Sequence, residues 1–274
     1  MTCLFPWNVS RHLPATKFSV SKVTYNRKGA MVLSGESRRA MPDTSGNLLL
    51  DSLPVGARRP CLEAGENVSL GLGEEIITQG DRAKHAYFPG GAVCSLTMGL
   101  KSGDKAECAI VGAEGVIGLS LLGGAPRSPI AAVVQIAGSG YRMPLASFAE
   151  LLQHNRPLRE AILLYAGFAL NVVGRSVACN SYHSIVQRLA RWLLMTHDRV
   201  ERDELSLTHD MLSQMLTATR PRVSLAAGKL RAMQVIDYQR GVVRILDRKR
   251  LEQVSCECYE ANRRYLQLLP WAAG

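Results

Sequence analysis

The spacing of apolar residues changes abruptly near residue 155. From about Asn67 to Arg142 the chain alternates short apolar runs with glycine-containing turns, as in "HAYFPGGAVCSLTM" and "IAAVVQIAG". Runs of this length between turn residues are typical of β-strands, and their regular spacing favours a small barrel or jelly roll. Because nothing repeats at a fixed period, a solenoid is disfavoured.

A long helix is predicted to follow the barrel. Asn155 can cap it, and Pro157 is tolerated in its first turn. Two apolar stripes then run side by side, which indicates contact with the barrel and with another helix at once. We therefore predict a dimerisation helix and hinge over residues 156–182, with a helix buried within one chain as the alternative. The predicted dimer stripe is Leu158, Ile162, Tyr165, Ala169, Val172, Ser176 and Cys179, and the neighbouring stripe is Leu163, Ala166, Leu170, Val173 and Val177.

The last third of the chain predicts a helix-turn-helix. Ser184 and Gln187 form a capping box at the start of one helix, and Thr208 is a good N-cap for the next. A break at residues 217–219 separates this short helix from another, and two short helices joined in this way form a helix-turn-helix. The predicted buried edges are Leu212, Met215 and Leu216 in the first helix and Val223, Ala227, Leu230 and Met233 in the second.

Arginines mark two places around this motif. Arg220 and Arg222 open its second helix, where the first residues of a reading helix meet base edges or phosphates. The stretch "VIDYQRGVVRIL" predicts a hairpin with a two-residue Arg240-Gly241 turn, which is a basic wing. We therefore predict binding to double-stranded DNA. The candidate contact residues are Thr208, Thr219, Arg220, Pro221, Arg222, Ser224, Leu225, Lys229 and Arg240.

The charge distribution agrees with this interpretation. The formal net charge is +10, and residues 219–250 hold nine Lys and Arg against two Asp. Residues 1–40 hold seven against one Glu. Two basic zones on a nearly neutral body indicate a polyanionic partner. The first zone lacks periodicity, so residues 1–45 are interpreted as a disordered or mis-assigned extension, with a DNA-touching basic arm as the alternative.

Cysteine usage and hydropathy narrow the setting. The seven cysteines are odd in number, scattered and without a CxxC pair, so a disulfide framework is disfavoured and a reducing cytosol is expected. No apolar run approaches the ~20 residues of a membrane span. We predict a cytoplasmic protein with no membrane partner.

Several stretches resemble the Crp/Fnr family of bacterial transcription regulators: "CNSYHSIVQRLARWLL", "LSLTHDMLSQML" and "VIDYQRGVVRILDRKRLEQVSCECY", with "YFPGGAVCSL" and "IVGAEGVIGL" upstream. The resemblance implies an α+β fold, with a cyclic-nucleotide-binding-like β jelly roll over residues 46–155. The long dimerisation helix, a winged helix-turn-helix over 183–259 and a tail over 260–274 follow. It also implies a homodimer on an inverted-repeat operator, RNA polymerase as a partner, and no enzymatic activity.

The effector region departs from the family pattern. Nucleotide-binding members present Gly-Glu and, further on, Arg-Ser or Arg-Thr. Here Gly118 is followed by Leu119, although Arg127 and Ser128 are retained. Leucine has no carboxylate to accept a hydrogen bond from the ribose hydroxyl. We therefore predict a degenerate effector domain whose small-molecule effector, if there is one, is unknown. A cyclic-nucleotide-responsive activator is the alternative.

No metal or cofactor is predicted. Oxygen-sensing members carry an N-terminal cysteine cluster, whereas Cys3 stands alone in that region. Cys256 and Cys258 have no partner motif, and two thiolates alone are a weak signal for metal. His183, beside Cys179, is interpreted as a residue that packs at the hinge.

The reading helix also departs from the family. By the resemblance, Arg220, Pro221 and Leu225 stand where many members carry Arg, Glu and Arg. Apolar side chains can only meet thymine methyls or select by shape, so the operator should differ from the best-known family consensus. Thr217 replaces a frequent turn glycine, with a strain of about 1 kcal/mol if this residue needs a positive φ.

Two other classes of function fit the sequence less well. An enzyme with an appended DNA-binding module needs a nucleophile–base pair, paired carboxylates, HExxH or a phosphate loop, and the sequence contains none of these motifs. An RNA-binding protein needs aromatic stacking platforms, and none is clustered in the basic zones. The sequence therefore favours a transcription regulator.

Overall fold

The computed structural model describes residues 44–122, 124–125, 127–200 and 202–272, with the dipeptides 24–25 and 31–32. The chain divides into two units, Met1–Ala40 and Met41–Gly274. In the first unit β1 (Thr24–Tyr25) pairs antiparallel with β2 (Met31–Val32). The rest of the predicted extension, up to residue 43, lies outside the described residues.

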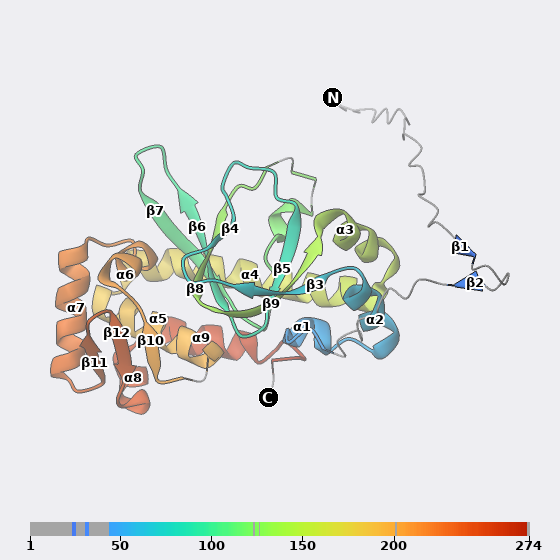
Figure 1. Cartoon of the computed structure of the whole chain (residues 1–274). Helices are drawn as coiled ribbons and strands as arrows, with labels where there is room; N and C mark the ends of the chain where they lie inside the picture. Colours follow the sequence, from blue (N-terminus) through green and yellow to red (C-terminus); the bar gives the residue numbers. More distant parts are fainter. Residues whose placement is uncertain are drawn as a thin grey trace, which may run out of the picture. The chain divides into compact units, whose positions relative to one another are not determined.

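Two antiparallel sheets form the jelly roll that the short apolar runs predict (Figure 1). One sheet has the strand order β3-β9-β5 and the other β4-β8-β6-β7. Their inward side chains make one core, in which the rings of Phe88 and Phe148 meet edge to face at 5.4 Å. The strands are β3 (Glu66–Leu70), β4 (Glu75–Ile77), β5 (His85–Pro89), β6 (Val93–Gly99), β7 (Lys105–Val111), β8 (Ala131–Ile136) and β9 (Gly138–Pro144).

Short helices close the jelly roll at the end where the chain enters it. Helices α1 (Leu48–Asp51) and α2 (Val55–Glu63) precede the first strand and were not predicted, and α3 (Leu145–His154) follows the last. The buried Asn47 caps α1 with its side-chain oxygen. Its amide group donates to the carbonyls of Pro89 and Gly115 at 2.7 and 2.9 Å, which ties α1 to the sheets.

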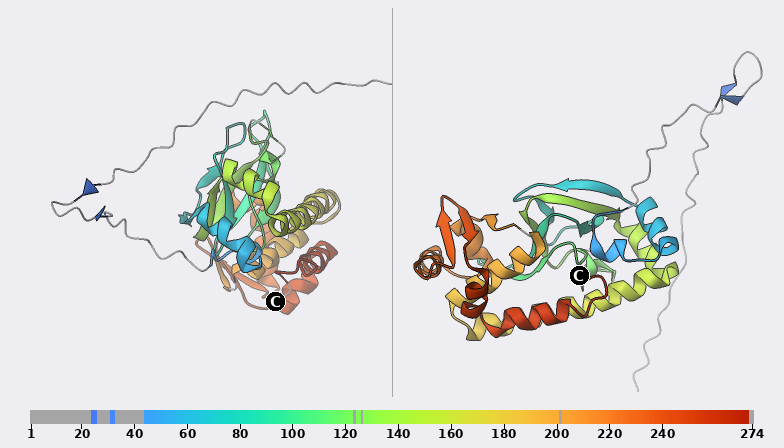
Figure 2. Two further views of the ribbon diagram at one scale, coloured as in Figure 1. Left: turned by 90° about the vertical axis from the view of Figure 1, so that its right-hand side faces the viewer. Right: turned by 90° about the horizontal axis from the view of Figure 1, so that it is seen from below.

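The long predicted helix is α4 (Arg156–Tyr182), which runs along the jelly roll toward the C-terminal domain (Figure 2). The predicted cap is confirmed, because the Asn155 side-chain oxygen accepts from the Leu158 amide at 3.1 Å. By length and hydropathy alone, α4 is long and apolar enough to cross a membrane. One of its faces, however, is packed into the core of the chain.

The predicted dimer stripe on α4 is wrong as an interface assignment. Leu158, Ile162, Tyr165 and Val172 belong to the jelly-roll core. Their own chain covers them, as it covers Ser176 and Cys179 further along, and only Ala169 is partly exposed. The 4-3-4-3 spacing identified an apolar face but could not say which body covers it. In the neighbouring stripe Leu163, Leu170 and Val177 are 65%, 75% and 64% exposed, while Ala166 and Val173 are half-buried.

A winged helix-turn-helix follows the hinge at His183 and Ser184. The capping box is confirmed, because Ser184 and Gln187 exchange backbone-to-side-chain hydrogen bonds of 3.0 and 3.4 Å. The sheet of the wing has the order β10-β12-β11, and its first strand was not predicted. The elements are α5 (Ile185–Val200), β10 (Glu204–Ser206), α6 (His209–Met215), α7 (Arg220–Ala232), β11 (Ile236–Gln239), β12 (Val242–Ile245) and α8 (Arg248–Val254).

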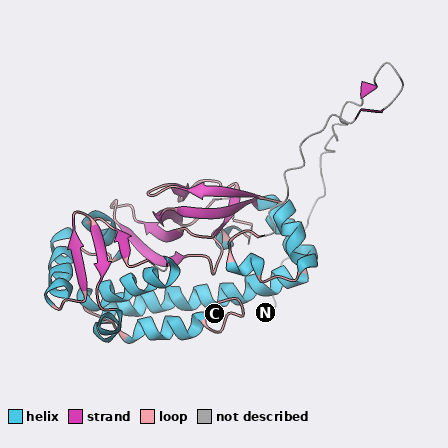
Figure 3. Ribbon diagram, turned by 60° about the horizontal axis from the view of Figure 1, so that its bottom comes forward, coloured by secondary structure: helices cyan, strands magenta, loops and turns pink. Residues whose placement is uncertain are grey.

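The predicted C-terminal tail is also corrected. The boundary at residue 259 falls inside α9 (Glu257–Leu266), which lies alongside α4 (Figure 3). Beyond it Leu269 is buried in the jelly-roll core. The Trp271 indole donates to the Glu114 carbonyl at 2.9 Å. Residues 265–272 therefore return to the barrel instead of forming a separate tail.

One core joins α5 to the jelly roll. Val93, Ile110 and Ile136 of the strands share a cluster with the apolar face of α5. The Trp192 indole donates to Glu107 at 2.9 Å, and burial raises the pKa of this carboxyl to about 7. Arg199 binds Glu114 at 2.7 Å, and the two side chains are only 6% and 5% exposed.

This buried ion pair gives a prediction for stability. Arg199→Met leaves the Glu114 carboxylate buried without its partner and should lower the free energy of unfolding by about 3–5 kcal/mol. The double variant Glu114→Gln/Arg199→Met removes both charges and should regain most of that loss. The exposed pair Arg142–Glu66 is the control, and Arg142→Met should cost less than about 1 kcal/mol. Urea unfolding measures all three variants, and equal losses in Arg199→Met and Arg142→Met would contradict the prediction.

Candidate nucleic-acid interface

The turn between α6 and α7 has the predicted form. The Thr208 hydroxyl accepts from the Met211 amide at 3.2 Å and so caps α6, while Leu212, Met215 and Leu216 are buried. Thr217 has a φ of +46°. A β-branched residue rarely adopts this conformation, at a cost of roughly 1–3 kcal/mol, so the turn carries the strain that the missing glycine predicted.

Helix α7 buries one face and exposes the other. Val223, Ala227 and Leu230 are buried as predicted, together with Ala226. Met233 is 39% exposed, so its assignment to the buried face is wrong, because the helix has ended by this residue. The predicted contact residues exposed around α7 are Thr219, Arg220, Pro221, Arg222, Leu225 and Lys229.

Two residues of α6, His209 and Asp210, lie against the start of α7. Arg220 lies 3.5 Å from the Asp210 carboxylate, and both side chains are 65% exposed, so this pair is weak enough to open for another anion. The Ser224 hydroxyl donates to the Arg220 carbonyl at 3.0 Å and lies 3.3 Å from Nδ1 of His209. Ser224 is half-buried, whereas the other predicted contact residues of α7 are exposed.

The wing is fastened to the start of α6. Arg240 and Gly241 have φ values of +49° and +80°, which confirms the two-residue hairpin turn. The Leu207 amide donates to the Gly241 carbonyl at 2.7 Å, and the Tyr238 hydroxyl donates to the Leu207 carbonyl at 3.0 Å. Burial raises the pKa of Tyr238, which keeps its donor proton in place. Arg240 is thus exposed at the tip of a braced hairpin.

Charges on this surface are partly unpaired. Arg222, Lys229 and Arg240 take part in no ion pair within the described residues, whereas Arg231 is paired with Asp237 at 3.2 Å. Unpaired cations on one exposed helix and one hairpin tip attract phosphate. The arrangement can therefore bind the backbone of a nucleic acid through α7 and through the tip of the wing.

Gly228 is a feature of this surface that the sequence analysis missed. It is exposed inside α7, beside Leu225 and Lys229, and a Cβ atom built on it would meet nothing within 4 Å. A glycine inside a helix costs about 1 kcal/mol relative to alanine, and packing within the chain does not require it here. In the sequence, a lone glycine inside a helical pattern indicates this position. Because Gly228 has no side chain, another molecule can approach the helix backbone closely there.

The jelly roll also reaches this surface. The loop between β6 and β7 shares a groove with the start of α7, lined by Asp104 and Lys105 on one side and by Arg220 and Arg222 on the other. These segments are more than 100 positions apart in sequence, so no local pattern could predict the contact. A displacement of the loop would directly alter the surroundings of both arginines.

The predicted effector residues fall into two separate sets of contacts. Gly118 has a φ of +115° and approaches Ala86, while Leu119 packs against the jelly-roll core. Arg127 is exposed and donates to the Gly80 carbonyl at 2.7 Å. Ser128 is buried, and its hydroxyl donates to the Ile130 carbonyl at 2.7 Å. Arg127 and Ser128 therefore hold the loop around Gly80.

The comparisons with known proteins agree with this architecture. Residues 187–254 match the Crp-like helix-turn-helix domain. FixK2 from Bradyrhizobium japonicum aligns with 17% identity and a TM-score of 0.60, covering 70% of this chain and 98% of its own. TTHA1359 from Thermus thermophilus, a transcriptional regulator of the CRP/FNR family, aligns with 21% identity and a TM-score of 0.57, covering 69% and 98%. A search of curated sequences found no match.

These findings support three of the expectations from sequence. The α+β fold, with a cyclic-nucleotide-binding-like jelly roll and a C-terminal winged helix-turn-helix, is confirmed. The resemblance is confirmed by the same matches. The predicted helix-turn-helix for DNA binding is supported by the domain match over residues 187–254.

Proposed function

We infer that this chain, a Crp/Fnr-type regulator by its helix-turn-helix domain and its fold, binds an inverted-repeat DNA operator as a homodimer. The observation that carries the proposal is the joint exposure of Arg220 and Arg222 at the start of α7 and of Arg240 at the tip of the wing. In a winged helix-turn-helix, these two places meet the major groove and the flanking backbone. Cytoplasmic location in a bacterium and RNA polymerase as a partner belong to the same proposal.

The proposed contact residues differ in whether they can reach the bases or the phosphates of the DNA. Arg220 projects from the first turn of α7, where its planar fork can bind guanine O6 and N7. Pro221 and Leu225 are exposed on the same helix and can meet thymine methyl groups. Thr219 and Lys229 flank them and suit phosphates. Thr208 and Ser224 are weaker candidates, because their hydroxyl groups already serve bonds within the chain.

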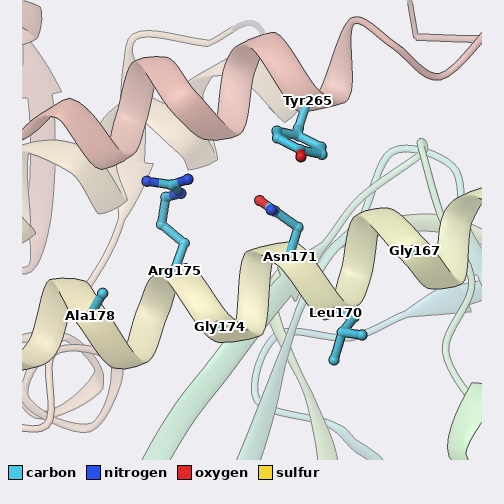
Figure 4. Close-up of a pocket in the computed structure, with 7 residues that line it drawn as sticks. All are labelled: Gly167, Leu170, Asn171, Gly174, Arg175, Ala178 and Tyr265. Atoms are coloured by element: carbon cyan, nitrogen blue, oxygen red, sulfur yellow. The ribbon is translucent and has the colours of Figure 1, made fainter.

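The dimer would form through the exposed stripe of α4. Leu163, Leu170 and Val177 have little contact with their own chain. Figure 4 shows that Leu170 points away from α9, while Asn171 and Arg175 point toward it. In aqueous solution, an exposed apolar stripe at heptad-like spacing is typically buried against a second helix. A two-fold axis along α4 would place two reading helices on half-sites about one helical turn apart.

The effector domain is proposed to be degenerate. Leu119 occupies the position of the expected glutamate and packs against the core, so no carboxylate is available there for a ribose hydroxyl. Arg127 is engaged with Gly80 rather than left for a phosphate. A different small-molecule effector is compatible with this jelly roll.

The reading surface gives a prediction for two arginines. Arg220→Ala should cost about 1–3 kcal/mol of affinity for the operator and relax the preference at one base pair in each half-site. Arg240→Ala should weaken all sequences about equally and reduce the slope of log affinity against log salt by about one. Titration of operator and scrambled DNA at several salt concentrations separates the two effects. If Arg220→Ala weakens both DNAs by one common factor, Arg220 binds phosphate and does not read a base.

The dimer face gives a second prediction. Leu170→Lys should shift the protein toward monomer at micromolar concentration and weaken operator binding in parallel, because a buried ammonium group would be desolvated in the interface. Leu72→Lys, at a leucine that is 53% exposed on the jelly roll, is the matched control and should change neither. Light scattering and DNA titration are the measurements. A Leu170→Lys protein that stays dimeric would exclude this face.

The effector domain gives a third prediction. Cyclic AMP and cyclic GMP at micromolar concentration should produce no binding heat in calorimetry and no gain in operator affinity, since neither the ribose nor the phosphate meets its expected partner. Micromolar binding with increased DNA affinity would establish the alternative, a cyclic-nucleotide-responsive activator.

A further inference from the structure

Three buried cysteines and a histidine meet where the long helix ends. Cys179 lies in the last turn of α4, His183 follows that helix, and Cys256 and Cys258 open α9. Their ligand atoms all lie within 4.8 Å of one another. In the sequence, Cys256 and Cys258 have no partner motif, and His183 is predicted to pack at the hinge. Tertiary structure supplies the two missing partners.

We propose that Cys179, His183, Cys256 and Cys258 bind one zinc ion that fixes the hinge between α4 and the winged helix-turn-helix. Zinc in structural sites takes four protein ligands in a tetrahedron, and three cysteines with one histidine are a usual set. Zn–S and Zn–N distances of about 2.3 and 2.0–2.1 Å place neighbouring ligand atoms about 3.5–3.8 Å apart. Sγ of Cys179 lies 3.5 Å from Sγ of Cys256, and Sγ of Cys258 lies 3.7 Å from Nδ1 of His183.

The histidine is oriented as a ligand. Its Nδ1 faces the thiols, while its Nε2 lies 3.0 Å from the Glu257 carboxylate. Metal-bound histidines generally donate their other ring N–H to such a group, which fixes the tautomer and the ring plane. Glu257 is 76% exposed and has no other hydrogen bond or ion pair among the described residues. A ring proton on Nε2, facing Glu257, would leave the lone pair of Nδ1 directed at the cluster.

The surroundings exclude water and supply one positive charge. Cys179, Cys256 and Cys258 are 0%, 3% and 2% exposed, so an ion among them is shielded from water. Arg191 is 7% exposed, its Nε and Nη1 have no hydrogen-bond partner, and its positive charge acts on all three thiols. Three thiolates and Zn²⁺ carry a net charge of −1, which this cation offsets. On binding, each thiol releases its proton to solvent, and His183 keeps the proton on Nε2.

The position of the cluster gives the ion a structural task. It joins the end of α4 and the adjacent hinge to the start of α9, which is far away in the sequence. Without the ion, these segments are held by packing, by the His183–Glu257 pair and by weak contacts of the thiols. The ligand atoms span the space of a single ion, which favours zinc over a larger iron–sulfur cluster. The relative orientation of α4 and the reading helix would then depend on metal.

Metal content tests the proposal directly and does not require DNA binding. The full-length protein is loaded with zinc under reducing conditions, passed through gel filtration and analysed by mass spectrometry of the elements. We expect about one zinc per chain in the wild type and in Cys108→Ser, whose cysteine lies on β7 outside the cluster. Cys256→Ser and Cys258→Ser should lose the ion, and Glu257→Gln should bind it roughly 10–100-fold more weakly.

A second measurement covers the case in which the cysteine variants fail to fold. In the native wild type, zinc should protect three thiols from an aromatic disulfide reagent, and cobalt should give the visible absorption of a tetrahedral thiolate complex. A wild type that retains no zinc, shows no thiol protection and carries a Cys179–Cys256 disulfide in its peptide map would overturn the proposal. Full zinc retention in folded Cys256→Ser/Cys258→Ser would overturn it equally.

Discussion

The placement of α4 is the constraint on which the rest of the structure depends. One face of this helix is committed to the jelly-roll core through Leu158, Ile162, Tyr165 and Val172. Each of these side chains contributes about 1.5–3 kcal/mol on burial, so the face cannot be released to a partner without a large loss of stability. The exposed stripe of Leu163, Leu170 and Val177 is the face on which we propose the dimer contact. The same fixed helix sets where the hinge begins and where α9 returns.

The winged helix-turn-helix is held against this frame by more than the hinge. The apolar face of α5 shares a core with β6, β7 and β8, and the buried Arg199–Glu114 pair joins α5 to the jelly roll. A buried ion pair contributes little net stability, because desolvation of the two charges opposes their attraction. Removal of one partner is nevertheless strongly destabilising, because the other charge stays buried without compensation. The pair therefore favours the one arrangement of α5 on the jelly roll in which both charges meet.

The start of α7 lies where these constraints meet. The strained Thr217 turn sets its direction, the bond from Ser224 closes its first turn, and the β6–β7 loop lies across the groove from Arg220 and Arg222. The start of the reading helix therefore shares this groove with the jelly roll of the same chain. The cysteine–histidine cluster restrains the other end of the domain.

Local sequence was sufficient to predict features that lie within a single helix end or turn. Asn155, Ser184 and Thr208 are confirmed as caps, and the Arg240-Gly241 turn is confirmed, because caps and tight turns depend on side chains within a few positions. The short strands before residue 155, the long helix and the basic reading helix followed from periodicity and charge, and the α+β fold class followed from the resemblance to the Crp/Fnr family. Tertiary structure alone decided which stripe of α4 is covered and that residues 265–272 return to the barrel. It also decided that two cysteines near the C-terminus meet Cys179 and His183. Periodicity reports that a face is apolar, and a cysteine reports a possible ligand, but what each one meets depends on contacts between segments far apart in the chain.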